Sequence, residues 1–291
     1  MKPAAFSYHR PRTLDEALAL LAEHGDAAKL IAGGQSLVPV MNMRLAAPAE
    51  LIDLNDLPGL AGIRDLGAVL EAGALTRQSE LAGSELVALR CPVLALAART
   101  IGHYVIRQRG TLGGSLAHAD PTAQLPLVAV LLDAEIVVAS RRGQRTLRAA
   151  EFFISVMTTV LEPDEIVVAV RFPVAAPGEG AAFELFSRRH GDFAIVAVAI
   201  TASERDGRFA GLRIALGGIG PVPAVYGDVC RAFVGQAADA AGVRAVAQAV
   251  AAAAKPEDDA RIPAAYRREL AQELTERALA RALARARGTT T

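Results

Sequence analysis

The sequence predicts an α+β protein made of two small mixed units followed by a C-terminal α+β domain. Short apolar, β-branched runs bounded by glycine and proline alternate with leucine- and alanine-rich helical stretches in the first 175 residues. The last third differs, because a β-hairpin pattern is followed by two helical patterns. At 291 residues the chain exceeds one modal domain, so subdomains that share a sizeable core are expected.

The first unit is placed at residues 1–57 and begins with a helix. Thr13 is suited to be its N-cap and Glu16 to complete a capping box, and Gly25 ends the helical pattern. Strands are expected over 29–32, running into Gly33 and Gly34, and over 51–54.

The second unit is placed at residues 58–175 and begins at Pro58–Gly59. Its expected elements are a strand over 69–73, a buried helix over 92–101, strands over 134–140 and 146–148 joined by a turn at 141–144, and a strand over 165–172. Prolines and glycines predict a linker at about 173–180.

The third unit is placed at residues 176–291. Apolar runs over 193–201 and 209–216, joined through Asp206–Gly207, predict a hairpin. Helices are expected within 237–254 and over 266–287. The second of these carries Leu270, Leu274, Ala278 and Leu283 on one face and charged residues, including Arg277 and Arg281, on the opposite, solvated face.

Composition excludes several classes of function. Thirty-one basic residues balance 31 acidic ones, so no positive field is available to attract nucleic acid. Two cysteines, Cys91 and Cys230, favour a reducing cytoplasm and are too few to ligate an iron–sulfur cluster. We expect no signal peptide and no membrane span, because no apolar run is long and uncharged enough. The five histidines show no metal-ligand spacing, so no metal site and no catalytic residue are assigned.

Two Gly-Gly segments carry the strongest chemical signal, one at Ala32–Ser36 and one within Thr111–Pro126. Glycines allow the backbone to approach phosphate oxygens, and the hydroxyls of Ser36, Thr111 and Ser115 can donate to the same oxygens. We interpret the chain as folded to bring both segments onto one phosphorylated ligand. The alternative for each segment alone is an ordinary turn. Neither matches the dinucleotide fingerprint or the P-loop.

These segments resemble the FAD-binding medium subunit of the molybdenum hydroxylases, the family of the carbon monoxide dehydrogenase and xanthine dehydrogenase flavoproteins. The resemblance rests on Ala32–Leu37 with Asn42–Arg44, Ile106–Ser115 with His118–Pro121, Arg188–Val196 and Leu216–Gly220, and it runs nearly end to end. It implies a two-subdomain FAD-binding fold of the vanillyl-alcohol oxidase/PCMH type, followed by a C-terminal flavoprotein domain.

The resemblance also implies the site. The pyrophosphate of FAD would lie between the two loops, Asp120 and Gln124 near the ribityl chain or ring, Val167 at the flavin edge and Phe193 near the ring. Gln124 stands where the family often has a carboxylate. The implied cofactor-binding residues are Ala32, Gly33, Gly34, Gln35, Ser36, Leu37, Thr111, Leu112, Gly113, Gly114, Ser115, Asp120, Gln124, Val167 and Phe193.

The implied function is electron transfer within a complex. FAD on this chain would pass electrons to an external acceptor. The molybdopterin and [2Fe–2S] clusters would reside on a molybdenum-binding large subunit and an iron–sulfur small subunit, in a dimer of heterotrimers. The alternatives are a stand-alone FAD-dependent oxidase or reductase, and a flavin-free binding module. The sequence does not distinguish among substrates or acceptors, and it leaves open whether Arg188–Asp192 is an ion-pair cluster or a partner-facing surface.

Overall fold

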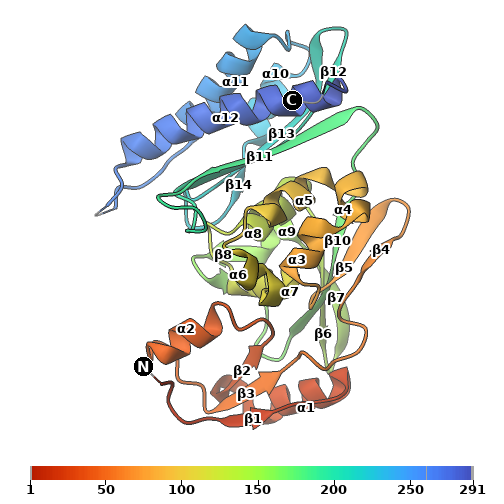
Figure 1. Ribbon diagram of the computed structural model, residues 1–291, viewed down its shortest axis with the longest axis vertical. Helices are drawn as coiled ribbons and strands as arrows, with labels where there is room; N and C mark the ends of the chain where they lie inside the picture. The colour runs from red at the N-terminus through yellow and green to blue at the C-terminus, as the bar shows by residue number, and fades with distance from the viewer. Residues whose placement is uncertain (1, 260, 290–291) are drawn as a thin grey trace.

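The computed structural model describes residues 2–259 and 261–289, in which three sheets follow one another along the long axis of the molecule (Figure 1). The N-terminal sheet lies at the bottom of that view, the central sheet with its helices in the middle, and the C-terminal sheet at the top. The α+β fold class predicted from the sequence is confirmed.

The N-terminal sheet has the order β1-β3-β2, and both of its strand pairs are parallel. Its elements are β1 (Ser7–His9), α1 (Leu14–His24), a short 3-10 turn (Gly25–Ala27), β2 (Ala28–Ile31), α2 (Leu37–Asn42) and β3 (Glu50–Asp53). The hydroxyl of Thr13 accepts from the amide of Glu16, as predicted for the N-cap. The Glu16 carboxylate, however, accepts from the amide of Arg12 at 2.7 Å rather than from that of Thr13.

The central sheet is antiparallel with the order β4-β5-β10-β6-β7. Its strands are β4 (Ile63–Asp65), β5 (Val69–Gly73), β6 (Glu135–Ser140), β7 (Gly143–Arg148) and β10 (Ile166–Pro173), and a small hairpin of β8 (Phe153–Ser155) and β9 (Thr158–Thr159) lies beside it. The helices of this layer are α3 (Gln78–Gly83), α4 (Glu85–Arg90), α5 (Pro92–Arg99), α6 (Tyr104–Arg109), α7 (Leu112–His118), α8 (Gln124–Leu132) and α9 (Ala149–Phe152).

The two faces of the central sheet bury different cores. Ile136 and Val138 face the helices, whereas Val137 and Ala139 join the core under α1. A bulge between Val167 and Ala169 shifts the register in β10. The N-terminal unit is therefore seated on the sheet through apolar side chains.

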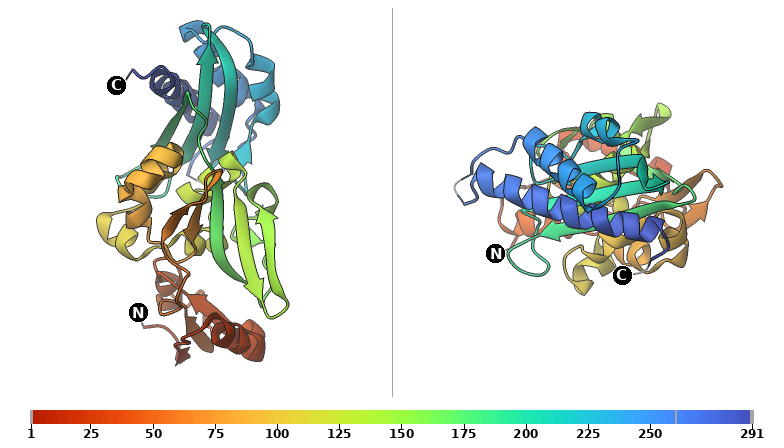
Figure 2. Two further views of the ribbon diagram at one scale, coloured as in Figure 1. Left: turned by 90° about the vertical axis from the view of Figure 1, so that its right-hand side faces the viewer. Right: turned by 90° about the horizontal axis from the view of Figure 1, so that it is seen from above.

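The C-terminal sheet is a layer between two sets of helices. Its strands, in order, are β11 (Glu179–Phe186), β12 (Val196–Arg205), β13 (Arg208–Gly217) and β14 (Ala224–Val225), and they are followed by α10 (Gly227–Phe233), α11 (Ala240–Ala253) and α12 (Ala264–Ala286). Figure 2 shows α11 and α12 side by side over one face. On the other face, Phe183, Ala199 and Ala215 share a core with α5 and α8.

The predicted hairpin of this sheet is confirmed, with Asp206 (φ 53°) and Gly207 (φ 72°) at its turn. A linker lies where it was predicted, at about 173–180, but it is shorter and covers residues 174–178, because β10 extends through Pro173 and β11 begins at Glu179. The strand expected from residue 193 begins only at Val196.

Two arginines on the predicted solvated face of α12 are exposed and also form ion pairs. Arg277 and Arg281 both bind the carboxylate of Glu184 on β11, which is only 8% exposed. They neutralise a buried charge and join α12 to the sheet. Within the described residues, no helix combines the length and the apolar character needed to cross a bilayer.

Candidate functional site

The first Gly-Gly segment, Ala32–Ser36, connects β2 to α2. Gly34 has φ of +69°, a left-handed conformation that favours glycine. Among the residues that the structure describes, none accepts a hydrogen bond from the backbone amides of residues 33–37, whereas the next amide, Val38, donates to Gly34 O at 3.0 Å. A run of unpaired amides in a tight turn is typical of an anion-binding concavity.

The second segment is not a loop but the beginning of α7. Thr111 caps this helix, and its Oγ1 accepts from the Gly114 amide at 3.1 Å. The amides of Leu112 and Gly113 donate to Thr76 O at 3.0 Å and Ala74 O at 2.8 Å. These donors are already engaged, which corrects the expectation that the Gly113 and Gly114 amides point at a ligand. The hydroxyl of Ser115 is half-buried and can donate to a ligand, whereas Thr111 is only 2% exposed.

The glycines of α7 are explained by close packing. A Cβ at Gly113 would stand 2.6 Å from Cβ of Ala74, and one at Gly114 would stand 2.7 Å from Oγ1 of Thr111. Gly113 is buried, whereas Gly114 is exposed. Gly114 is therefore the position where the surface of α7 stays flat enough for a ligand to approach.

The two segments meet in space. A Cβ on Gly33 would come within 2.3 Å of the Arg109 carbonyl oxygen and 2.8 Å of Cα of Gly110. Thr111 follows directly in the chain. This backbone contact packs the first Gly-Gly segment against the two residues that lead into the second.

A polar bridge that the sequence did not predict joins the same segments. The Asn55 side chain donates to Ala32 O at 2.8 Å. Arg77 donates to Oδ1 of Asn55 at 2.7 Å and to the Arg109 carbonyl at 2.6 Å. We call this arrangement the Asn55–Arg77 bridge. No motif marks either residue, and the only local signal is an asparagine placed directly after a strand.

Gln78 adds an unpaired acceptor at the junction. The backbone N–H of Gln78 donates to Gly110 O at 2.9 Å, and the Gln78 side chain is buried against Gly110. Within the described residues, Oε1 of Gln78 has no hydrogen-bond donor. A buried polar atom of this kind is normally satisfied, so a donor from a bound molecule or water fits here.

Asp120 and Gln124 lie just beyond α7, at the turn into α8. Oδ1 of Asp120 accepts from the amide of Thr122 at 2.8 Å and from its hydroxyl at 2.6 Å, which fixes the carboxylate in a local turn. Gln124 is 5% exposed, and its Nε2 donates to Thr100 O at 3.4 Å. From the C-terminal sheet, Gly218 donates to the Pro121 carbonyl at 3.0 Å and braces this turn.

Val167 and Phe193 occupy contrasting environments. Val167 is buried in the core of the central sheet at the β10 bulge, so its side chain has the packing of an ordinary strand residue. Phe193 is 64% exposed in the loop before β12. That loop rests on the residue preceding α6, since a Cβ at Gly191 would stand 2.5 Å from the His103 ring.

The motif cluster Arg188–Asp192 belongs to this same exposed loop. Arg188, Arg189 and Asp192 are all exposed, and among the described residues no ion pair joins them. This favours an outward-facing surface over a structural ion pair.

The chain matches two family models in succession. Residues 4–175 match the FAD binding domain in molybdopterin dehydrogenase, and residues 181–282 match the CO dehydrogenase flavoprotein C-terminal domain. The chain is 46% identical over 220 residues to the 6-hydroxypseudooxynicotine dehydrogenase complex subunit alpha of Paenarthrobacter nicotinovorans, covering 75% of this chain and 74% of that protein. It is 38% identical to the carbon monoxide dehydrogenase medium chain of Hydrogenophaga pseudoflava, covering 94% of this chain and 96% of that one.

Solved structures agree with these matches. The carbon monoxide dehydrogenase of Hydrogenophaga pseudoflava that lacks the Mo-pyranopterin moiety superposes with a TM-score of 0.94 at 38% identity, covering 98% of this chain and 99% of that chain. Quinoline 2-oxidoreductase from Pseudomonas putida 86 gives 0.93 at 34% identity, with both chains covered completely. The chain belongs to the family of FAD-binding medium subunits of the molybdenum hydroxylases.

Proposed function

We propose that this chain binds FAD with the pyrophosphate at the junction of Ala32–Leu37 and Thr111–Ser115, and serves as the electron-transfer subunit of a molybdenum-containing hydroxylase. The observation that carries the proposal is the run of unpaired amides at residues 33–37, whose first residue, Gly33, packs against the backbone that leads into Thr111. Such amides stabilise phosphate oxygens without any positively charged side chain. The donor set therefore fits a pyrophosphate.

The other site residues have distinct proposed roles. Ser36 and Ser115 supply hydroxyl donors, whereas Thr111 caps α7 and Leu112, Gly113 and Gly114 set the shape of the surface. Asp120 and Gln124 position the ribityl chain, and Phe193 covers one side of the ring. Val167 contributes its backbone at the flavin edge. When bound, the flavin supplies the capacity to accept and release electrons, and the protein holds and orients it.

The remaining redox centres are proposed to lie on other chains. Burial raises the pKa of the Cys91 thiol to about 12 and that of Cys230 to about 11, so neither is poised to act as a thiolate ligand. We assign the [2Fe–2S] clusters to a small subunit and the molybdopterin to a large subunit. The same cysteine usage is the basis for a proposed cytoplasmic location.

The relatives named above include a subunit alpha of a complex and a medium chain, which supports a multi-subunit assembly. Large apolar side chains are exposed around α7, as expected for a surface that a partner covers. They are Tyr104, Val105, Ile154, Val156 and Met157. We propose a heterotrimer with the two partner subunits, doubled into a dimer.

The proposed division of this chain at residues 57 and 175 follows the sheets, each of which takes its strands from one unit.

Co-purification tests this function. The full chain expressed alone should carry FAD, identified after release by its absorbance and chromatographic retention, yet should oxidise no hydroxylase substrate. Expressed from its native gene neighbourhood, it should co-purify with iron–sulfur and molybdenum subunits. Substrate turnover by the chain alone would instead establish a stand-alone flavoprotein, and a colourless chain that cannot be reconstituted with FAD would rule out both.

A further inference from the structure

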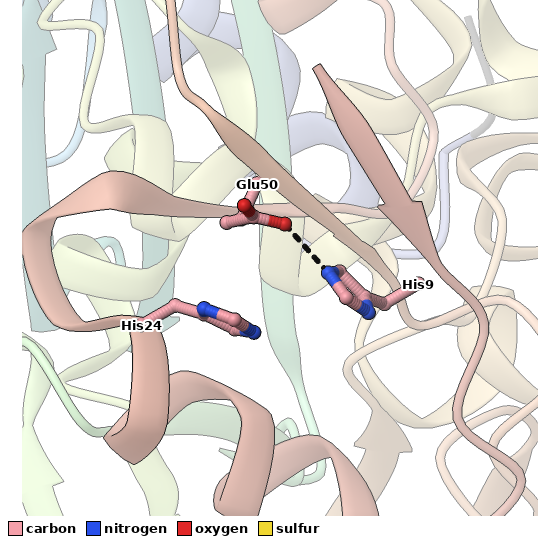
Figure 3. A group of neighbouring side chains, drawn as sticks. All are labelled: His9, His24 and Glu50. Carbon is pink, nitrogen blue, oxygen red and sulfur yellow. Dashed lines mark hydrogen bonds and ion pairs between the residues drawn. The ribbon is translucent and has the colours of Figure 1, made fainter.

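Three potential metal ligands converge on the N-terminal sheet, away from the Gly-Gly junction. They are His9 on β1, His24 at the end of α1 and Glu50 at the start of β3 (Figure 3). Nε2 of His9 lies 2.7 Å from Oε2 of Glu50, and the centroids of the two imidazole rings are 5.0 Å apart. One ligand atom from each residue falls within 4.8 Å of the others.

The backbone fixes this convergence. Parallel pairing sets Ser7 opposite Glu50, so His9 lies two positions further along β1 on the same face as Glu50. Helix α1 covers that face, because Ala17, Leu18 and Leu21 belong to the same buried cluster as Ile52. The last residue of the helix therefore reaches the other two side chains. All three ligands come from regular elements, which hold a site more firmly than loops do.

We propose that His9, His24 and Glu50 form a zinc site in which water fills the fourth position. Two imidazoles and one carboxylate are the donor set of open, three-ligand zinc sites. Tetrahedral Zn²⁺ with ligands at about 2.0–2.1 Å requires donor atoms roughly 3.4 Å apart. The His9–Glu50 pair must open by less than about 1 Å and His24 must approach, both of which side-chain rotation provides.

Charge and access are suitable for a cation. Glu50 supplies the carboxylate of the donor set, and its Oε2 already lies 2.7 Å from Nε2 of His9. The side chains of His9 and Glu50 are 27% and 20% exposed, which leaves a path to solvent. Among the described residues, His24 has no hydrogen-bond partner for its ring, so both nitrogens are available.

Bound zinc would join β1, β3 and α1. The small N-terminal unit would gain a cross-link between its sheet and its helix. The inference is independent of FAD, because none of the three residues belongs to the proposed flavin site. The alternative is a His9–Glu50 ion pair with a neighbouring imidazole and no metal.

The experiment uses the full chain without a histidine tag, stripped with a chelator and dialysed against Zn²⁺. We expect one zinc per chain in the wild type and in His190→Gln, which removes an exposed imidazole elsewhere. The zinc dissociation constant should rise at least about tenfold in His24→Gln and in Glu50→Gln. His24→Gln keeps the His9–Glu50 ion pair, so it separates metal loss from unfolding.

Two further readouts make the result decisive. Zinc should raise the melting temperature of the wild type and of His190→Gln but not of His24→Gln, since a ligand stabilises only a state that binds it. X-ray absorption at the zinc edge should show nitrogen and oxygen ligands with imidazole scattering. A wild-type chain that retains no zinc, or retention equal in all variants, would overturn the proposal.

Discussion

The backbone of Gly33 touches the backbone of Arg109, and the carbonyl oxygen of Arg109 lies only 2.3 Å from where a Cβ on Gly33 would stand. The first Gly-Gly segment is therefore packed, backbone against backbone, on the residues that lead into Thr111. Any side chain at residue 33 must move one segment away from the other.

Replacement of Gly33 by alanine tests this contact. The added methyl group overlaps backbone that cannot rotate aside, so we expect Gly33→Ala to lower the free energy of unfolding by about 1–3 kcal/mol and to reduce the FAD bound per chain. Gly83→Ala is the matched control, because a Cβ there meets nothing within 4 Å. Denaturant titration and flavin absorbance measure the two effects. Full flavin content in Gly33→Ala would contradict the site assignment.

The Asn55–Arg77 bridge predicts energetic coupling. Asn55→Ala and Arg77→Gln each release one end of the connection between Ala32 and Arg109, so both should weaken FAD binding. Because either change breaks the same bridge, the double variant should lose less than the sum, with a coupling of about 0.5–3 kcal/mol. Fluorescence titration of the flavin-free chain measures the dissociation constants. Arg12→Gln is the control, because the Arg12 side chain is 71% exposed and forms a surface ion pair with Asp56. This variant should leave the dissociation constants unchanged. Strict additivity would show that the bridge does not act as a unit.

Gly114→Val addresses the exposed surface of α7. The new Cβ would crowd the Thr111 hydroxyl that caps the helix, at a cost of about 1 kcal/mol, and the branched side chain would occupy the face where FAD approaches. We expect FAD binding to be lost while the chain stays folded. Ala117→Val places the same side chain on an exposed position of the same helix and should keep its flavin. Circular dichroism and flavin content distinguish the outcomes, and normal flavin in Gly114→Val would exclude the proposed approach.

Glu165 predicts how stability depends on pH. Its carboxylate accepts from Nε and Nη2 of Arg145 at 2.6 and 2.8 Å, and this pairing lowers its pKa although burial opposes the shift. A carboxyl group whose pKa is lowered in the folded state stabilises the fold above its unfolded value of about 4.3 and loses that contribution as the pH falls further.

Glu165→Gln should therefore be less stable than the wild type by about 1–2 kcal/mol at neutral pH, and the difference should shrink below about pH 4. Urea unfolding at several pH values measures it. Glu273→Gln, which changes an exposed residue of α12, should follow the wild-type curve. A difference that is constant at all pH values would show that the ionised carboxylate is not the stabilising species.

The sequence predicted those elements whose local signals agree with their tertiary environment. The hairpin at Asp206–Gly207 was placed correctly, because the β-branched residues of Val196–Thr201 and a turn dipeptide define it, and the strand at Val69–Gly73 was placed correctly as well. Helix α7 was not predicted, since two glycines in its first turn disfavour a helix. It forms because Thr111 caps it and because Ala74 and Thr76 accept its first amides, contacts that depend on the rest of the fold.

Only part of the candidate site could be predicted from the sequence, for the same reason. The meeting of the two Gly-Gly segments could be predicted, because both carry a chemically specific pattern. Asn55 and Arg77 could not, since a hydrogen bond between residues far apart in sequence leaves no local trace. The same holds for the convergence of His9 and His24, which follows from strand pairing and helix packing rather than from ligand spacing.

The core that β11–β13 share with α5 and α8 limits which segments of this chain can be exchanged with those of a relative. The two family segments divide between residues 175 and 181, but the apolar layer crosses that boundary, with Phe183 and Ala199 on one side and the helices on the other. A hybrid that joins residues 4–175 to the C-terminal segment of a relative would combine two half-cores from different proteins. Productive chimeras must therefore exchange the facing surfaces of α5 and α8 together with the sheet, and a fragment that stops at residue 175 would expose them to aggregation.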